Sequence, residues 1–293
     1  MSLDLTRQYL DGQAIGIFGA GHLGRSVADG LLGLGLPRNQ IVLCHRGTQA
    51  TRYQLSADGL DDLVVEAGQL ISRSRIVLYL VRPQQYDAIE KYRVREDSLF
   101  VSFLAGIPLK RIAVDVADDN RMRVMTSAPD TLRRRHGLAA LYATHAAASG
   151  PMLEILESLG LRIVMLSQET AIHAFTALGP CLPIALTYWS SLGNTIDELE
   201  ILETARRHAL PDFDAILQWA LSAQPLGLSN DERDLYLTQA VTPGGVTDAI
   251  ISAMKNGLRF SQALDRGIER SRELGRSTWS GVLKRYRVRI WHA

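Results

Sequence analysis

The sequence is poor in cysteine and in net charge. Only 2 cysteines occur among 293 residues, Cys44 and Cys181, on separate expected elements and without metal-ligand spacing. We therefore expect buried free thiols, with neither a disulfide nor a metal site. The 32 basic and 31 acidic residues leave a net charge of +1, which gives no electrostatic reason to expect nucleic acid or an anionic membrane as a partner.

Long apolar runs are also lacking. Residues 1–7 carry charges where a secretory signal needs an apolar stretch, and we expect no run that approaches the roughly 20 apolar residues of a membrane span. A cytoplasmic protein is therefore expected. The length of 293 residues suggests two domains, and a hydrophobic content of 46% allows each domain an ordinary core.

The first half of the chain alternates short apolar runs with helical patterns. This alternation indicates an α/β domain in which helices cover both faces of a mostly parallel sheet. The expected strands are 14–18, 41–45, 63–65, 76–81, 98–104, 123–126, 138–144 and 161–166. The last two could extend the sheet as a pair, with a helix over 152–159 between them.

Strand patterns are absent after residue 166, so residues 167–293 are predicted to form an all-helical domain. The expected helices are 169–178, 183–192, 196–208, 212–221 and 246–274. Residues 182–188 are apolar nearly all round, which on a helix means burial on every side. We favour a subunit interface over a domain core for this stretch and expect the helical domain to mediate a homodimer.

A glycine-rich turn follows the first expected strand, and it reads Gly19-Ala20-Gly21-His22-Leu23-Gly24. Gly19 permits a tight reversal, Gly21 lets backbone amides approach a pyrophosphate, and Gly24 lets the next helix pack against the strand. That helix directs free N–H groups at the phosphates. Residues 1–166 are therefore predicted to form a Rossmann-type dinucleotide-binding domain.

The end of the second expected strand indicates which dinucleotide is bound. An acidic residue there would hold a ribose 2′-hydroxyl, whereas a basic residue suits a 2′-phosphate. The chain has His45-Arg46-Gly47-Thr48 and no acid at this point. Arg46 can bind a phosphate through two N–H groups, and Thr48 can donate one further hydrogen bond. We predict NADP, with NADPH preferred over NADH.

A second turn precedes the last long helical pattern. Pro243, Gly244 and Gly245 come just before Val246 and Thr247. A proline and two glycines at a helix start leave backbone amides that can bind a carboxylate. From the residues alone, this segment is either an anion site or a plain turn.

Seven short motifs, in order over most of the chain, resemble the pyrroline-5-carboxylate reductases, which reduce a cyclic imine to proline with a nicotinamide cofactor. The motifs are Gly19 to Gly24, His45 to Thr48, Val81-Arg82-Pro83-Gln84, Ser102 to Ile107, Arg123-Val124-Met125, Val241 to Thr247, and an Arg-Ser-Arg-Glu-Leu ending at Leu274.

The resemblance implies roles for particular residues. The Pro243–Val246 turn would hold the substrate carboxylate, Thr247 would orient the imine nitrogen or help to protonate it, and Thr176 would line the pocket. A dimer built through the helices would let this turn complete the partner's site. Hydride transfer to an electrophilic iminium carbon needs mainly positioning. The residues implied to bind the cofactor, besides those already given, are Val81, Arg82, Pro83, Ala105 and Gly106.

Two departures fall where the family pattern touches the reacting groups. The family has Asn-Thr where this chain has Ser127 and Ala128, on the expected nicotinamide side. The family's Gly-Ser-Gly is replaced by Pro180-Cys181-Leu182, and its tyrosine position falls at Ala185. These changes predict a reshaped and more apolar pocket.

Three functions stay open. The first is NADPH-dependent reduction of a small carboxylated cyclic imine, pyrroline-5-carboxylate to proline or a close analogue. The second is a catalytically inactive NADP-binding regulatory protein of the same fold. The third is a reductase of another imine or of a carbonyl. A carbonyl mechanism that relies on a lysine early in the second domain lacks that residue, because the only lysines are at positions 91, 110, 255 and 284.

Overall fold

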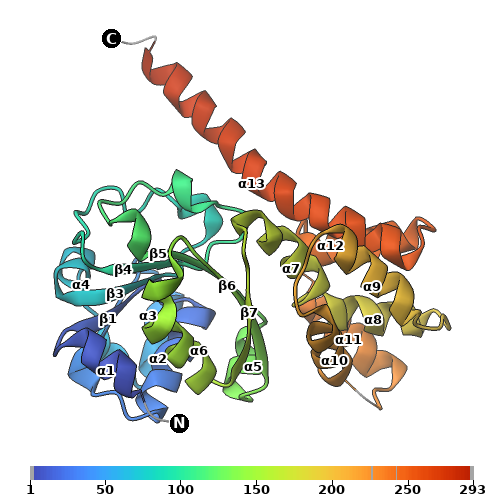
Figure 1. Cartoon of the computed structure of the whole chain (residues 1–293), viewed down its shortest axis with the longest axis horizontal. Coiled ribbons are helices and arrows are strands. Elements are labelled where there is room, and N and C mark those ends of the chain that lie inside the picture. The colour runs from blue at the N-terminus through green and yellow to red at the C-terminus, as the bar shows by residue number, and fades with distance from the viewer. Residues whose placement is uncertain (1–2, 226, 242, 291–293) are drawn as a thin grey trace. The chain divides into compact units, whose positions relative to one another are not determined.

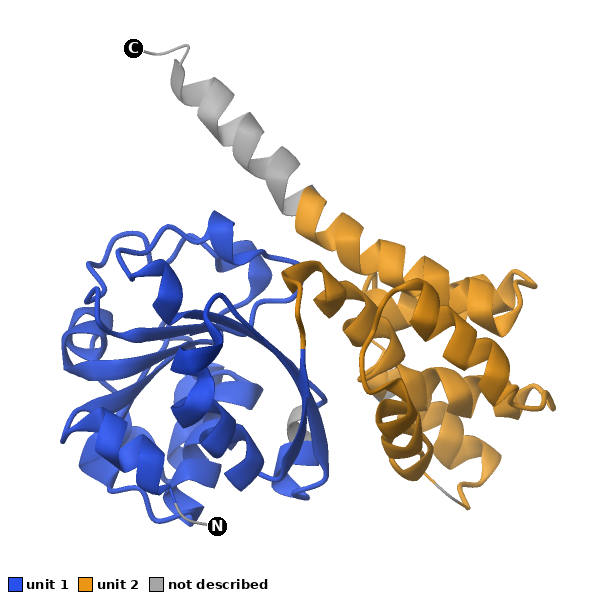
Figure 2. Cartoon of the chain, in the orientation of Figure 1, with its two compact units in different colours: residues 1–165 blue, residues 166–293 orange. Residues whose placement is uncertain are grey.

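The computed structural model describes residues 3–225, 227–241 and 243–290 (Figure 1). The chain divides into two compact units, Met1–Met165 and Leu166–Ala293, which Figure 2 distinguishes by colour. The division falls one residue before the sequence-based boundary. The first unit contains the sheet, and the second is helical in its described residues, so the predicted fold class is confirmed.

The first unit is built on a seven-stranded mixed sheet with the order β2-β1-β3-β4-β5-β6-β7. The pairs from β2 to β5 are parallel, β5 and β6 are antiparallel, and β6 and β7 are parallel. The strands are β1 Ala14–Phe18, β2 Ile41–Cys44, β3 Ser74–Tyr79, β4 Leu99–Ser102, β5 Arg121–Thr126, β6 Gly137–Ala143 and β7 Leu161–Met165.

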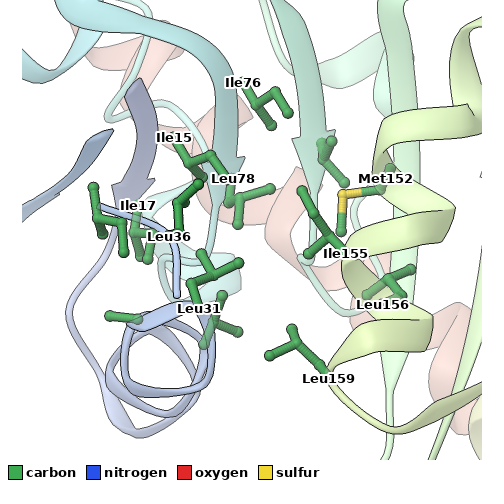
Figure 3. Close-up of a cluster of buried hydrophobic side chains, with 14 of the residues drawn as sticks. Ile15, Ile17, Leu31, Leu36, Ile76, Leu78, Met152, Ile155, Leu156 and Leu159 are labelled. Atoms are coloured by element: carbon green, nitrogen blue, oxygen red, sulfur yellow. The ribbon is translucent and has the colours of Figure 1, made fainter. Parts of the chain in front are cut away.

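One face of this sheet packs against α2 and α6. Figure 3 shows Met152 and Ile155 of α6, and Leu159 just after this helix, pointing toward the side chains of β1, β3 and α2. A Cβ atom at Gly30 of α2 would collide with Leu159, so this glycine allows the two helices to approach closely. The helices of this unit are α1 Asp4–Leu10, α2 His22–Gly33, α3 Gln49–Ala57, α4 Ala67–Arg73, α5 Pro129–Arg133 and α6 Gly150–Ser158.

The opposite face packs against α4 and an aromatic cluster. A side chain at Gly16 of β1 would collide with Leu70 of α4, so the helix lies directly on the strand. Further along, the Phe18 and Tyr79 rings meet edge to face with centroids 5.4 Å apart. Because both faces are covered, all five residues of β1 are buried, which explains its unbroken apolar pattern.

The second unit contains seven helices in the described residues. They are α7 Ile172–Leu178, α8 Leu182–Ser191, α9 Glu198–Arg207, α10 Phe213–Ser222, α11 Asn230–Ala240, α12 Val246–Lys255 and α13 Phe260–Ile290. The predicted single helix over 246–274 is wrong. Gly257, with a φ of 82°, ends α12 after Lys255, and a new helix starts at Phe260.

Two other expectations differ from the structure. The strand expected over 63–65 is reduced to one bridge between Val64 and Leu43, because a 3₁₀ turn, Asp61–Leu63, takes up its start. Helix α11 was not predicted, although Ser229 and Glu232 form a capping box at its start. The apolar residues of α11 show almost no helical periodicity, so the sequence pattern did not indicate this helix.

One stretch, Glu169–Ser191, is long and apolar enough to cross a membrane by length and composition, which the sequence-based expectation overlooked. Within that window, 67% of the residues are buried inside the protein. The stretch also changes direction between α7 and α8, where Gly179 has an irregular backbone. Its apolar character therefore fits a core pair of helices in the second unit. Most of residues 182–188 are buried within the single chain, so the subunit interface favoured for this stretch is corrected to a domain core.

Candidate functional site

The parallel register brings the predicted cofactor residues of the first unit to one edge of the sheet. Phe18 pairs with both Cys44 and Tyr79, and Tyr79 pairs with Ser102. The segments that follow β1, β2, β3 and β4 therefore leave the sheet side by side. These segments hold Gly19 to Gly24, Arg46 and Thr48, Val81 to Pro83, and Ala105 with Gly106.

The three glycines of the first turn are required for different reasons. Gly19 has a φ of 123°, and a Cβ there would lie 2.7 Å from the carbonyl oxygen of Leu80. A Cβ at Gly24 would collide with the Gly19 carbonyl oxygen. A Cβ at Gly21 would meet no atom within 4 Å. The protein's own packing thus explains Gly19 and Gly24, whereas the space beside Gly21 is open.

Gly21 is also the N-cap of α2, and no side chain caps this helix. The first turn of α2 contains no acidic residue. Ala20, His22 and Leu23 complete the turn around this helix end, which carries partial positive charge. The open space and the uncapped amides together fit a pyrophosphate, as the motif predicts.

Two exposed arginines lie beside the end of β2. Neither the Arg46 nor the Arg52 guanidinium has a hydrogen bond or ion pair with any described residue. A Cβ at Gly47 would lie 3.3 Å from Nη2 of Arg52, so this guanidinium reaches across the turn. The Thr48 oxygen accepts a hydrogen bond from the Thr51 N–H at 3.3 Å and caps α3.

Sequence inspection missed Arg52, because the residue lies on the following helix rather than in the motif. The signal that could have identified it is its position: Arg52 lies in the first half of the helix that follows the turn after Arg46. The arginine pair fits a 2′-phosphate, and the nearby helix start adds further N–H groups.

The segments after β3 and β4 complete this edge. Arg82 is exposed, and its guanidinium makes no hydrogen bond or ion pair within the described part of the chain. The Tyr79 hydroxyl donates to the Gln85 carbonyl at 3.0 Å and holds the loop that starts with Val81 and Pro83. Gly106 has a φ of 76° and turns the chain after Ala105.

Ser127, where the family pattern has asparagine, is 3% exposed. Its hydroxyl lies 2.6 Å from the Thr131 hydroxyl and accepts a hydrogen bond from the Leu138 N–H at 2.9 Å. Thr131 in turn donates to the Ala128 carbonyl at 2.6 Å, so Ser127 supplies the proton between the two hydroxyls. The serine is committed to joining β5, α5 and β6.

In the second unit, side chains bind both the N–H and the carbonyl of Gly244. The Gly244 N–H donates to the Asp248 carboxylate at 2.8 Å. Arg270 of α13 donates to the Gly244 carbonyl through Nε at 2.9 Å and through Nη2 at 2.7 Å. Glu273 pairs with Arg270, and the Arg266 and Arg270 guanidiniums hold the pKa of Glu273 below its ordinary value. The turn is therefore held in place before any ligand binds.

Pro243 and Gly244 are exposed, and Gly245 is the N-cap of α12 without a side-chain cap. The N–H groups of Val246 and Thr247 stand in the first turn of α12, where a helix offers no internal partner. Asp248 also occupies this turn and brings its own carboxylate to the helix end. The sequence-based argument for an anion site did not include this acid.

Thr247 and Thr176, the two predicted catalytic residues, meet around Cys181. The Thr247 hydroxyl donates to Sγ of Cys181 at 3.2 Å. The Cys181 N–H donates to the Thr176 carbonyl at 3.3 Å, while the Thr176 hydroxyl donates to Ile172 at 2.7 Å. Thr247 and Thr176 are 7% and 9% exposed. Burial raises the pKa of the Cys181 thiol to about 11, so the sulfur stays protonated at neutral pH.

Comparisons with known proteins agree with the fold and with a dinucleotide-binding first unit. The family described as NADP oxidoreductase coenzyme F420-dependent matches residues 14–106. A pyrroline-5-carboxylate reductase of Pseudomonas aeruginosa is 29% identical over 272 residues, which cover 89% of this chain and 96% of that protein. Among solved structures, a pyrroline-5-carboxylate reductase from Coxiella burnetii has a TM-score of 0.55 at 20% identity and covers 90% of this chain and 98% of its own.

A pyrroline carboxylate reductase from Plasmodium falciparum, solved with NADP bound, has a TM-score of 0.53 at 18% identity and covers 90% of this chain and 98% of its own. The fold and the edge of the sheet thus define the class: an NAD(P)-dependent oxidoreductase by homology, with a Rossmann-type domain and a helical C-terminal region. Within that class, the chain is similar to pyrroline-5-carboxylate reductases, at 24–29% identity over about 90% of its length.

We predict opposite effects for alanine at two glycines of the first turn. Gly21→Ala should unfold in urea within about 0.5 kcal/mol of the unchanged protein, since its Cβ meets no atom, but it should bind NADPH at least ~10-fold more weakly. Gly24→Ala should lose about 2–3 kcal/mol of folding stability, because its Cβ meets backbone. Undiminished NADPH affinity in Gly21→Ala would contradict the assigned pyrophosphate position.

Removing either arginine beside β2 should affect NADPH and spare NADH. Arg46→Ala and Arg52→Ala should each weaken NADPH binding by about 10-fold, the loss expected for a charge-assisted hydrogen bond. Fluorescence titration with both cofactors measures the difference. Arg93→Ala is the matched control, because Arg93 is exposed and lies on the loop leading to the opposite end of β4. Equal losses for NADPH and NADH would exclude contact with the 2′-phosphate.

Proposed function

We propose that the chain reduces a small carboxylated cyclic imine, pyrroline-5-carboxylate or a close analogue, with NADPH as the hydride donor. The observation that carries the proposal is the pairing of a fixed Gly244 turn with a buried Thr247 hydroxyl at one helix start. A protein that only sensed nucleotide would have no use for this second arrangement. The similarity to curated pyrroline-5-carboxylate reductases supports the same reaction class.

NADPH, when bound, supplies the hydride and leaves as NADP⁺. Gly19 to Gly24 would hold its pyrophosphate, and Arg46 with Arg52 would hold its 2′-phosphate. On the substrate side, the Val246 and Thr247 N–H groups would bind the carboxylate, and the Thr247 hydroxyl would contact the ring nitrogen. Such chemistry needs positioning more than a strong acid or base.

The test is an assay of NADPH oxidation with pyrroline-5-carboxylate, run beside the six-membered piperideine carboxylate and a panel of keto acids. We expect oxidation with a cyclic imine and a fall of at least ~100-fold in kcat/KM for Thr247→Ala, since a positioned polar contact to the reacting group is lost. NADPH binding without turnover of any imine would support the inactive regulatory protein. Turnover of keto acids alone would support a carbonyl reductase.

We also propose a homodimer built through the helical unit, in the cytoplasm, with a small-molecule imine as the only other partner. Leu192, Leu199 and Leu235 are 51%, 72% and 57% exposed in the isolated chain, and a partner subunit could cover such residues. Light scattering of the purified protein should give twice the mass of the chain. A fully active monomer would contradict the proposal.

A further inference from the structure

The contact between Thr247 and Cys181 joins two helix starts. Cys181 is the N-cap of α8, yet its side chain does not cap that helix. Thr247 is the second residue of α12, and its hydroxyl donates to the cysteine sulfur at 3.2 Å. Cys181 is 8% exposed and stands where the family pattern has serine. The sulfur therefore holds the hydroxyl that the proposed function requires.

The direction of this hydrogen bond sets what Thr247 can offer to a ligand. Thr176 and Thr187 donate to carbonyls four residues back, at 2.7 and 2.8 Å, as buried helix threonines commonly do. Thr247 instead donates to Cys181. A hydroxyl has one proton and two lone pairs, so an oxygen that has given its proton to sulfur can only accept from a further partner.

We propose that Cys181 is a positioning residue that turns the Thr247 oxygen into a hydrogen-bond acceptor, so that the site takes the substrate as a protonated cyclic iminium ion. This inference rests on the proposed function and specifies its substrate. The half-buried Asp248 carboxylate, one residue further along α12, also favours a cation over a neutral imine at this helix end.

The chemistry balances without a proton from Thr247. The iminium nitrogen already carries its proton and donates it, as a hydrogen bond, to the Thr247 oxygen. Hydride from NADPH adds to the iminium carbon, and the C=N π electrons become the nitrogen lone pair. The product is a neutral secondary amine that keeps the same N–H, and solvent protonates it after release. Thr247 orients the ion and is neither acid nor base.

The first experiment tests which way the hydrogen bond to the ligand runs. Proline has a ring N–H group, whereas tetrahydrofuran-2-carboxylate has a ring oxygen that can only accept. With NADP⁺ present, calorimetry should show proline binding at least ~10-fold more tightly, and Thr247→Val should abolish that preference. Cys181→Ala should reduce the preference, and Cys181→Ser should restore it. Equal or tighter binding of the oxygen analogue would overturn the proposal.

Kinetics of the same variants separate positioning from packing. Cys181→Ala should lower kcat about tenfold with KM changed less than twofold, whereas Cys181→Ser should stay within about threefold of the unchanged protein. In a Thr247→Ser background, which keeps a hydroxyl, Cys181→Ala should again lower kcat. In a Thr247→Val background it should have almost no further effect. Additive losses in that last background would assign Cys181 to packing alone and overturn the inference.

A third measurement does not depend on activity. Because the chain has only two cysteines, Cys44→Ala leaves Cys181 as the one source of an infrared S–H stretching band. Because the sulfur accepts from Thr247 and does not use its own proton in this contact, Thr247→Val should leave the band nearly in place, as should the control Thr187→Val. A marked shift to higher wavenumber in Thr247→Val alone would show that the thiol donates to Thr247 and would overturn the inference. An unmoved band in a protein that binds neither ring compound would keep the direction of the hydrogen bond but reject both the proposed function and the iminium substrate.

Discussion

The backbone of the turn after β1 is fixed between two neighbouring strands. The arrangement of the predicted cofactor residues at this edge of the sheet depends on this constraint. The N–H groups of Gly19 and Ala20 both donate to the Cys44 carbonyl, at 3.1 and 3.2 Å, which ties the turn to the end of β2. On its other side, the Gly19 Cα faces the peptide after Leu80 too closely for any side chain. The start of α2 is therefore aimed by backbone contacts alone.

Because of that rigidity, the groups proposed to bind phosphate are held in position without a ligand. The open space at Gly21 lies beside a turn that is fixed on both sides. Arg46 and Arg52 lie in the segment that follows β2, the strand paired with β1. In the second unit the equivalent role belongs to side chains. Asp248 binds the N–H of Gly244 and Arg270 binds its carbonyl, so the Gly244 turn depends on charged side chains rather than on close backbone packing.

The two ways of fixing a turn differ in how they can be predicted. Glycine spacing at Gly19 to Gly24 reports a steric requirement that is local in sequence, so sequence alone predicted the strand, the turn and the helix. The roles of Arg270 and Cys181 arise from contacts between residues far apart in the chain. Arg270 lies 26 residues from Gly244, and Cys181 lies 66 residues from Thr247. No local pattern encodes such partners.

Errors in the predicted elements have similar causes. A helical period runs through 246–274 without a proline, and only the left-handed conformation at Gly257 reveals that two helices meet there. The expected strand over 63–65 has suitable residues but lies at the sheet edge, where Val64 alone pairs with Leu43. In both places tertiary context decided between structures that the residues allow equally well.

The two departures from the family pattern have different physical consequences, and the difference favours an active enzyme. At Ser127 the hydroxyl donates to Thr131 and accepts from Leu138 inside the sheet domain, in place of the amide that the family pattern has at this position. At Cys181 the exchange of serine for cysteine keeps a hydrogen-bond acceptor within reach of Thr247. Sulfur accepts more weakly than oxygen and is larger, so the pocket changes in shape while the reacting hydroxyl stays oriented. Under the proposed function, altered specificity accounts for both departures, whereas loss of activity would account only for the first.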